Sequence, residues 1–108
     1  MSKVKIITFG ETLRNLREET KMPLRKVAAV LDIDQSTLSK IERNERKPNV
    51  SMISQIAKIF NANKNDLLVA FYSDVVACEI KKEKHFSEIL HVAEAKIEYQ
   101  RTKLKKTK

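Results

Sequence analysis

The chain has 108 residues, of which 42% are hydrophobic and 33% charged, so it has enough apolar content for a core and should not be disordered. A single cysteine excludes an intramolecular disulfide framework, and the single glycine together with many helix-favouring residues favours an all-α protein. No apolar stretch is long enough for a signal peptide or a membrane span, so we expect a soluble cytoplasmic protein with no membrane partner.

The formal net charge of +8 is unevenly distributed along the chain. Residues 1–72 carry a net charge of +5, residues 101–108 carry another +5, and residues 73–100 carry −2. Such an excess of basic side chains favours a polyanionic partner, nucleic acid more often than an anionic membrane surface. The middle segment is not expected to contact DNA.

Five short helices are predicted between residues 9 and 72, after a short basic arm at 1–8. Thr8 and Glu11 match a capping box that begins a first helix over about 9–20. Pro23 begins the second helix, which ends near Leu31. The residues expected to cap the third, fourth and fifth helices are Asp34, Asn49 and Asn63.

A sixth helix is predicted from about Ser73–Asp74 to Leu104, followed by a basic tail at 105–108 that should fray. Its apolar residues follow the alternating spacing of four and three that is typical of a coiled-coil seam, over about two and a half heptads. This spacing favours dimerisation, and the alternative is an amphipathic helix packed on its own domain. The seam residues are Phe86, Leu90, Ala93, Ile97 and Leu104.

The segment from Leu24 to Ile41 has the form of two short helices joined by a three-residue turn. Such helices cross steeply, which exposes one face of the second helix. Ala28 is small enough for the closest approach of the two helices. Five apolar residues should fill the interior: Val27, Leu31, Ile33, Leu38 and Ile41. The residues left outside are polar or cationic and none is acidic: Gln35, Ser36, Ser39, Lys40 and Arg43.

Residues Phe9 to Leu68, about 60 of the 108, resemble the XRE (Cro/CI-type) helix-turn-helix family. The matching stretches are Gly10–Glu19, Val27–Leu31, Ser36–Pro48, Ile56–Phe60 and Asp66–Leu68. The resemblance implies a five-helix lambda-repressor-like DNA-binding domain over 9–72, with the long C-terminal helix over 73–104 outside it. It implies sequence-specific binding of double-stranded DNA by a homodimeric transcriptional regulator.

The resemblance also implies roles for individual residues. Gln35, Ser36 and Lys40 resemble base-reading residues, since glutamine pairs with adenine and lysine donates to guanine. Arg17 and Glu42 resemble a structural ion pair that fixes the third helix against the first. The residues expected at the sugar-phosphate backbone are Leu24, Arg25, Thr37, Ser39, Arg43, Arg46, Lys47 and Asn49.

The chain departs from the family pattern at turns where glycine is common. The residues at those positions are Asp32, Asn44 and Asn61. Apart from glycine, Asn and Asp are the residue types that best tolerate a positive φ. Pro23 stands where a polar cap is usual before the second helix, which puts a side-chain phosphate contact there in doubt.

Other functions remain open at this stage. The C-terminal helix could bind a toxin, which would make the chain an autoregulating antitoxin, and it vaguely resembles the same helix in regulators of restriction-modification loci. An enzyme is disfavoured because Cys78, His85 and His91 lack metal-ligand spacing and no nucleotide loop is present. RNA binding is disfavoured because stacking aromatics are missing. No cofactor, metal or small-molecule ligand is inferred.

Overall fold

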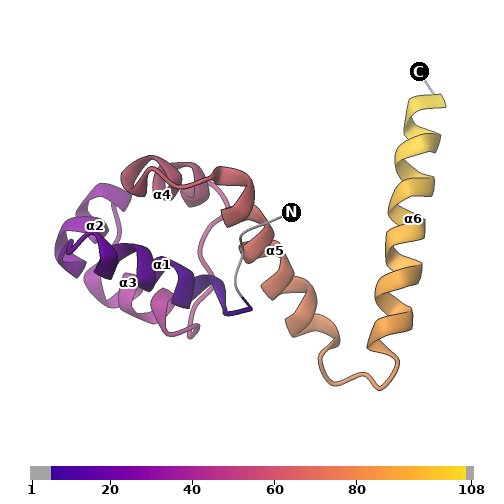
Figure 1. Ribbon diagram of the computed structural model, residues 1–108, viewed down its shortest axis with the longest axis horizontal. Helices are drawn as coiled ribbons and strands as arrows, with labels where there is room; N and C mark the ends of the chain where they lie inside the picture. The colour runs from indigo at the N-terminus through magenta and orange to yellow at the C-terminus, as the bar shows by residue number, and fades with distance from the viewer. Residues whose placement is uncertain (1–5, 107–108) are drawn as a thin grey trace. The chain divides into compact units, whose positions relative to one another are not determined.

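The computed structural model describes residues 6–106 and shows an all-helical fold, which confirms the predicted fold class. The chain divides into two compact units, Met1–Val76 and Ala77–Lys108. The described helices are α1 (Phe9–Glu19), α2 (Leu24–Leu31), α3 (Gln35–Glu42), α4 (Met52–Phe60), α5 (Lys64–Ile80) and α6 (Phe86–Lys106) (Figure 1). Most of the predicted arm, residues 1–5, and the tail residues 107–108 lie outside the described residues.

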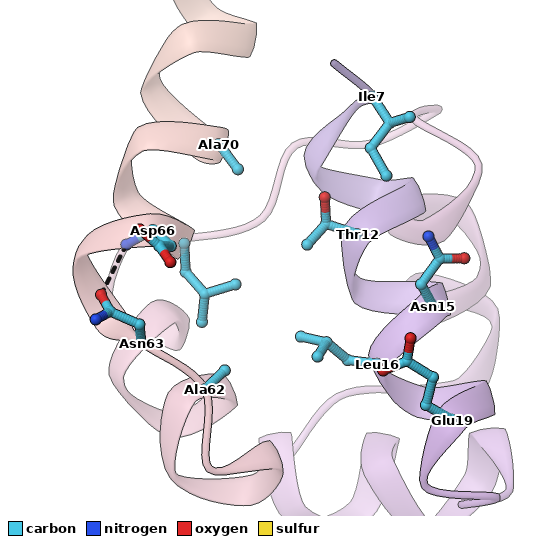
Figure 2. A pocket seen from close by; sticks show the side chains of 10 residues that line it. Ile7, Thr12, Asn15, Leu16, Glu19, Ala62, Asn63, Asp66 and Ala70 are labelled. Atoms are coloured by element: carbon cyan, nitrogen blue, oxygen red, sulfur yellow. Dashed lines mark hydrogen bonds between the residues drawn. The ribbon is translucent and has the colours of Figure 1, made fainter. Parts of the chain in front are cut away.

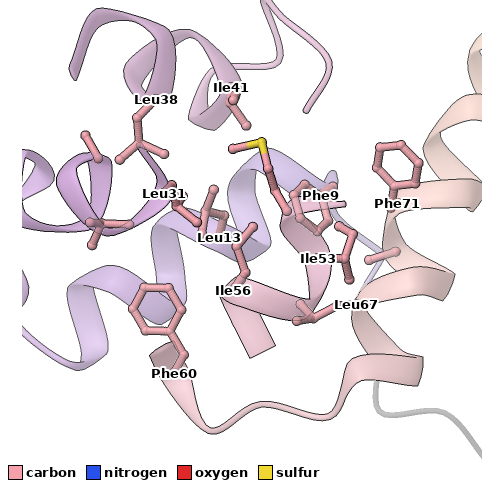
Figure 3. Close-up of a cluster of buried hydrophobic side chains, with 14 residues drawn as sticks. Phe9, Leu13, Leu31, Leu38, Ile41, Ile53, Ile56, Phe60, Leu67 and Phe71 are labelled. Carbon is pink, nitrogen blue, oxygen red and sulfur yellow. The ribbon is translucent and has the colours of Figure 1, made fainter. Parts of the chain in front are cut away.

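The first unit is built around one hydrophobic core to which α1 to α5 all contribute (Figure 3). α3 packs against α1 and α2, and α4 packs against the same two helices. Ala28, on α2, is buried, as expected for a small residue at the helix crossing. The most deeply buried large side chains are Leu13, Val27, Leu38, Ile53 and Ile56. Ile33 is only partly buried at the edge of this core.

The predicted capping box begins α1. The Thr8 hydroxyl accepts from the Glu11 amide at 3.2 Å, and the Glu11 carboxylate accepts from the Thr8 amide at 3.0 Å. These bonds favour the charged form of Glu11, so its pKa lies below the ordinary value of 4.5. The start of α1 is therefore fixed by two reciprocal hydrogen bonds.

The three turns in which Asp or Asn replaces glycine have the left-handed backbone that the sequence predicts. The φ angles are 58° at Asp32, 63° at Asn44 and 51° at Asn61. Lys21, at the end of α1, also has a positive φ of 57°, which its residue type did not indicate.

The predicted helix caps are present in part. The Asn63 side chain accepts from the Asp66 amide at 3.0 Å and so caps α5. Asp34 stands at the N-cap of α3 but makes no side-chain capping bond. The prediction for Asn49 is wrong, because Ser51 is the N-cap of α4 and Asn49 accepts from the Ser51 amide within the preceding turn.

The predicted start of the last helix near Ser73–Asp74 is also wrong, because α5 continues to Ile80 and α6 begins only at Phe86. Both residues expected at that helix start have other roles. The Ser73 hydroxyl donates back to the Ala70 carbonyl at 3.1 Å, and the Asp74 carboxylate accepts from the Phe9 amide at 2.7 Å. Asp74 thus satisfies a free amide at the start of α1 instead of starting a helix.

The second unit contains the end of α5, a turn at residues 81–85 and α6. No side chain described in this unit is buried. The seam residues on α6 are exposed, except Ala93, which is half-buried. The apolar stripe of α6 is therefore largely exposed in the part of the chain that the structure describes.

Candidate nucleic-acid interface

The outer face of α3 carries the residues predicted to read bases. Gln35, Ser36 and Lys40 are exposed, whereas Thr37 and Ser39 are half-buried. The helix, all of which the structure describes, contains one acidic residue, Glu42, and that residue is buried. The exposed face is therefore made of neutral polar groups and one cation, which suits a negatively charged partner.

The inner end of α3 is fixed to α1 by the predicted pair of Arg17 and Glu42, which the structure brings together. Arg17 Nε donates to Glu42 Oε2 at 2.7 Å, and Nη2 donates to Oε1 at 3.1 Å. The side chains are 17% and 5% exposed, respectively. The hydrogen bond to Glu42 raises the pKa of Arg17 above its usual value. Because the pair forms two parallel hydrogen bonds, it fixes the orientation of α3 in addition to holding α3 against α1.

The C-terminal end of α3 also touches the start of α1. A Cβ on Gly10 would clash with the carbonyl oxygen of Ile41 and would lie 2.8 Å from that of Glu42. The Asn44 side chain donates to the Thr8 hydroxyl at 2.7 Å. The capping residue of α1 therefore also holds the turn that ends α3.

The loop after α3 places further cations beside the exposed face. Arg43, Arg46, Lys47 and Asn49 are all exposed, as a contact with the DNA backbone would require. Arg43 is not isolated, because it forms an ion pair with Glu45 and donates to the Ser39 hydroxyl.

The start of α2 presents unbonded amide groups. Pro23 is the N-cap and makes no side-chain bond, while its carbonyl accepts from the amides of Lys26 and Val27. Within the described part of the chain, the amides of Leu24 and Arg25 have no hydrogen-bond partner. Arg25 is exposed beside them. Free amides at a helix start favour an anion such as phosphate.

Comparison with known proteins agrees with this geometry. Residues 13–67, about half of the chain, match the helix-turn-helix family HTH_3. The chain belongs to this XRE-type helix-turn-helix family. The family is one of DNA-binding proteins and not of enzymes, as the sequence led us to expect.

One relative of this helix-turn-helix chain is the HTH-type transcriptional regulator DdrOP3 of Deinococcus deserti. The two are 33% identical over 69 residues, which make up 62% of this chain and 54% of the relative. The chain thus matches only about half of the length of that regulator.

The helix-turn-helix unit also has a groove away from the exposed face of α3. It has a volume of about 420 Å³ and lies between α1 and the beginning of α5 (Figure 2). Leu16 and Leu67 line it, with Glu19 and Asp66 also among its lining residues. Its residues differ from every predicted DNA-contact residue.

The contacts of two residues in the helix-turn-helix unit were not predicted from the sequence. Glu45 pairs with Arg43, the residue predicted to bind phosphate. Glu45 follows Arg43 by two residues in a polar loop, where no helical periodicity indicates which side chains meet. The Asp74 carboxylate bonds the Phe9 amide at the start of α1 from 65 residues away, so no local pattern could indicate its partner.

In the described residues, no helix is long and apolar enough to cross a membrane, and no group of metal-ligating side chains is present.

Proposed function

We propose that this protein is a homodimeric transcriptional regulator that binds double-stranded DNA sequence-specifically, with α3 in the major groove. The observation that carries this proposal is the outer face of α3, which is exposed and lacks acidic groups, while its inner face is fixed by the Arg17–Glu42 pair. The major groove of DNA is wide enough for one α-helix, and bases are read there by side chains that hydrogen-bond to base edges. A helix held firmly in place with exposed polar side chains meets both requirements.

Specific side chains support direct reading of bases. The exposed Gln35 amide has both a donor and an acceptor, which match N7 and N6 of adenine. The exposed Lys40 ammonium donates to O6 and N7 of guanine, and Ser36 lies on the same exposed part of α3. These three residues would determine the sequence that is bound.

Other residues would position the helix on the backbone. The free amides of Leu24 and Arg25 favour a phosphate at the start of α2. Thr37 and Ser39 would contact the backbone beside the groove. The loop would supply Arg43, Arg46, Lys47 and Asn49. If each copy neutralises about four phosphates, log K should fall with log salt at a slope of about −7.

The proposal includes a second copy because the apolar stripe of α6 is exposed in the single chain. Pairing through α6 would bury that stripe. A dimer would present two copies of α3 about 34 Å apart, so the operator should be an inverted repeat with half-sites about one helical turn apart.

The decisive experiment is selection of bound duplexes from a random pool, followed by binding measurements with variants. We expect Lys40→Ala to weaken binding to the selected site by about 1–3 kcal/mol and to relax the sequence preference at one position of each half-site. Lys58→Ala, which removes an exposed lysine from α4, should leave the preference unchanged. Selection that yields no common sequence would contradict specific binding.

The antitoxin alternative makes a different prediction about the isolated chain. If α6 binds a toxin instead of a second copy, the protein alone should have the 12.5 kDa mass of a single chain in light scattering. A stable mass of about twice that value favours the regulator.

A further inference from the structure

The guanidinium of Arg43 has a carboxylate on one edge and a hydroxyl on the other. Arg43 Nε donates to Glu45 Oε2 at 3.0 Å, and Nη2 donates to Glu45 Oε1 at 3.1 Å. Nη1 donates to the Ser39 hydroxyl at 2.9 Å. These three hydrogen bonds orient the side chain of Arg43 beside α3.

The two donors that Glu45 occupies form the edge by which arginine binds an oxyanion in bidentate fashion. Carboxylate and phosphate groups both match this fork of two parallel N–H groups. The Nη1 bond to Ser39 fixes the opposite side of the guanidinium, so the protein directs the Nε–Nη2 edge at one anion. A DNA phosphate that uses the same edge must replace the carboxylate.

We propose that Glu45 is an internal competitor for the DNA phosphate that Arg43 binds. The inference rests on the proposed function, since it requires Arg43 to meet the DNA backbone. Glu45 holds the guanidinium in the binding-competent position before DNA arrives, and the exchange of carboxylate for phosphate lowers the net gain from that contact. Glu45 thereby limits the affinity of the free protein for any duplex.

The solvent exposure of the pair makes this exchange feasible. The side chains of Arg43 and Glu45 are 50% and 55% exposed, respectively. An exposed ion pair is weak, since water and salt screen it, so a phosphate can displace the carboxylate. A buried pair such as Arg17–Glu42 would not exchange in this way.

The test compares Glu45→Gln with a matched control, Glu18→Gln. Glu18 pairs with Arg14 on α1 at 3.2 Å, with side chains 54% and 56% exposed, respectively. Both substitutions remove one negative charge from an exposed Arg–Glu pair, and neither residue is in the proposed DNA-contact set. The probe is a random-sequence duplex of about three helical turns. Thermal melting establishes that both variants are folded.

We expect Glu45→Gln to raise the association constant about 2- to 5-fold at low salt, the range that an exposed ion pair spans. Glu18→Gln should change the association constant less, because the charge that it removes lies outside the proposed DNA contact. Equal increases for both variants would overturn the proposal, since net charge would then explain the effect.

A double-mutant cycle separates competition for Arg43 from direct repulsion between Glu45 and DNA. In an Arg43→Met background, Glu45→Gln should no longer raise the affinity, because no guanidinium remains to be released. An increase of the same size in that background would overturn the proposal. Failure of the wild type to bind any duplex would refute the proposed function, whereas normal binding with no effect of Glu45→Gln would refute only this inference.

Discussion

Gly10 shows how one missing side chain positions the helix that we propose reads DNA. Its backbone is helical and has no positive φ, so space and not conformational freedom explains the residue. An added Cβ would collide with backbone carbonyls at the end of α3, which cannot rotate away as a flexible side chain would. The close approach of the start of α1 to the end of α3 therefore depends on this glycine.

We predict that Gly10→Ala destabilises the protein by about 1–3 kcal/mol, the usual cost of overpacking. Alanine gains about 1 kcal/mol of helix propensity over glycine, which offsets part of that cost. Urea denaturation measures the net effect. As a control, Asn15→Ala at an exposed position of α1 should leave stability unchanged or slightly higher. A Gly10→Ala protein as stable as the wild type would show that α1 and α3 can separate without loss.

The Arg17–Glu42 pair makes a second prediction at the residue scale. We expect Glu42→Ala to cost about 3 kcal/mol, since breaking a buried pair leaves Arg17 without its partner. DNA binding should be lost indirectly, because Glu42 does not face outward. Denaturation of Arg17→Met, of Glu42→Leu and of the double variant Arg17→Met/Glu42→Leu tests this. The double variant should lose less stability than the sum of the singles. An unchanged melting temperature for Glu42→Ala would contradict the structural role.

At the scale of the element, the capping box of α1 should make stability depend on pH. The pKa of Glu11 is lowered in the folded state, chiefly by the bond from the Thr8 amide. The folded protein therefore binds this proton less readily than the unfolded chain does. The contribution is fully present above the ordinary pKa of 4.5 and is lost as the pH falls through the lower folded value.

The matched variant for this prediction is Glu11→Gln, which keeps an acceptor for the Thr8 amide but does not titrate. The stability advantage of the wild type over Glu11→Gln should be constant above about pH 5 and should shrink below it. Urea denaturation over a pH series measures the difference. Parallel curves for the two proteins down to about pH 2 would show that Glu11 contributes nothing through its charge.

The elements of the first unit could be predicted from the sequence because their signals are local. The capping box at Thr8 and Glu11 and the left-handed turn at Asp32 depend on residues a few positions apart. The end of α5 could not be predicted in this way, since Asp74 is held by the amide of Phe9 far away in the chain. The face of α3 followed from helical periodicity, whereas the role of Glu45 required the folded loop.

At the scale of the whole molecule, the second unit poses a stability problem. None of its described side chains is buried, and Cys78 is free. A second copy would supply the missing burial, and this would link the stability of α6 to the dimeric state that symmetric DNA binding requires.

A substitution in the seam tests this link against a matched control on the same helix. Leu90 lies in the stripe, whereas Val92, two residues on, lies more than half a turn away at 3.6 residues per turn. The two are 43% and 42% exposed in the single chain, so exposure alone does not distinguish them. We predict that Leu90→Asp dissociates the proposed dimer, because a charge in the proposed seam would have to be desolvated when the two copies pair.

We expect light scattering to give a single-chain mass for Leu90→Asp and about twice that mass for Val92→Asp. Binding to the selected operator should weaken together with dimerisation in Leu90→Asp, while the second variant binds normally. If Leu90→Asp remains dimeric, α6 is not the interface, since no other surface is altered by this change. If both variants dissociate, any charge on α6 disrupts pairing, and the predicted heptad register is wrong.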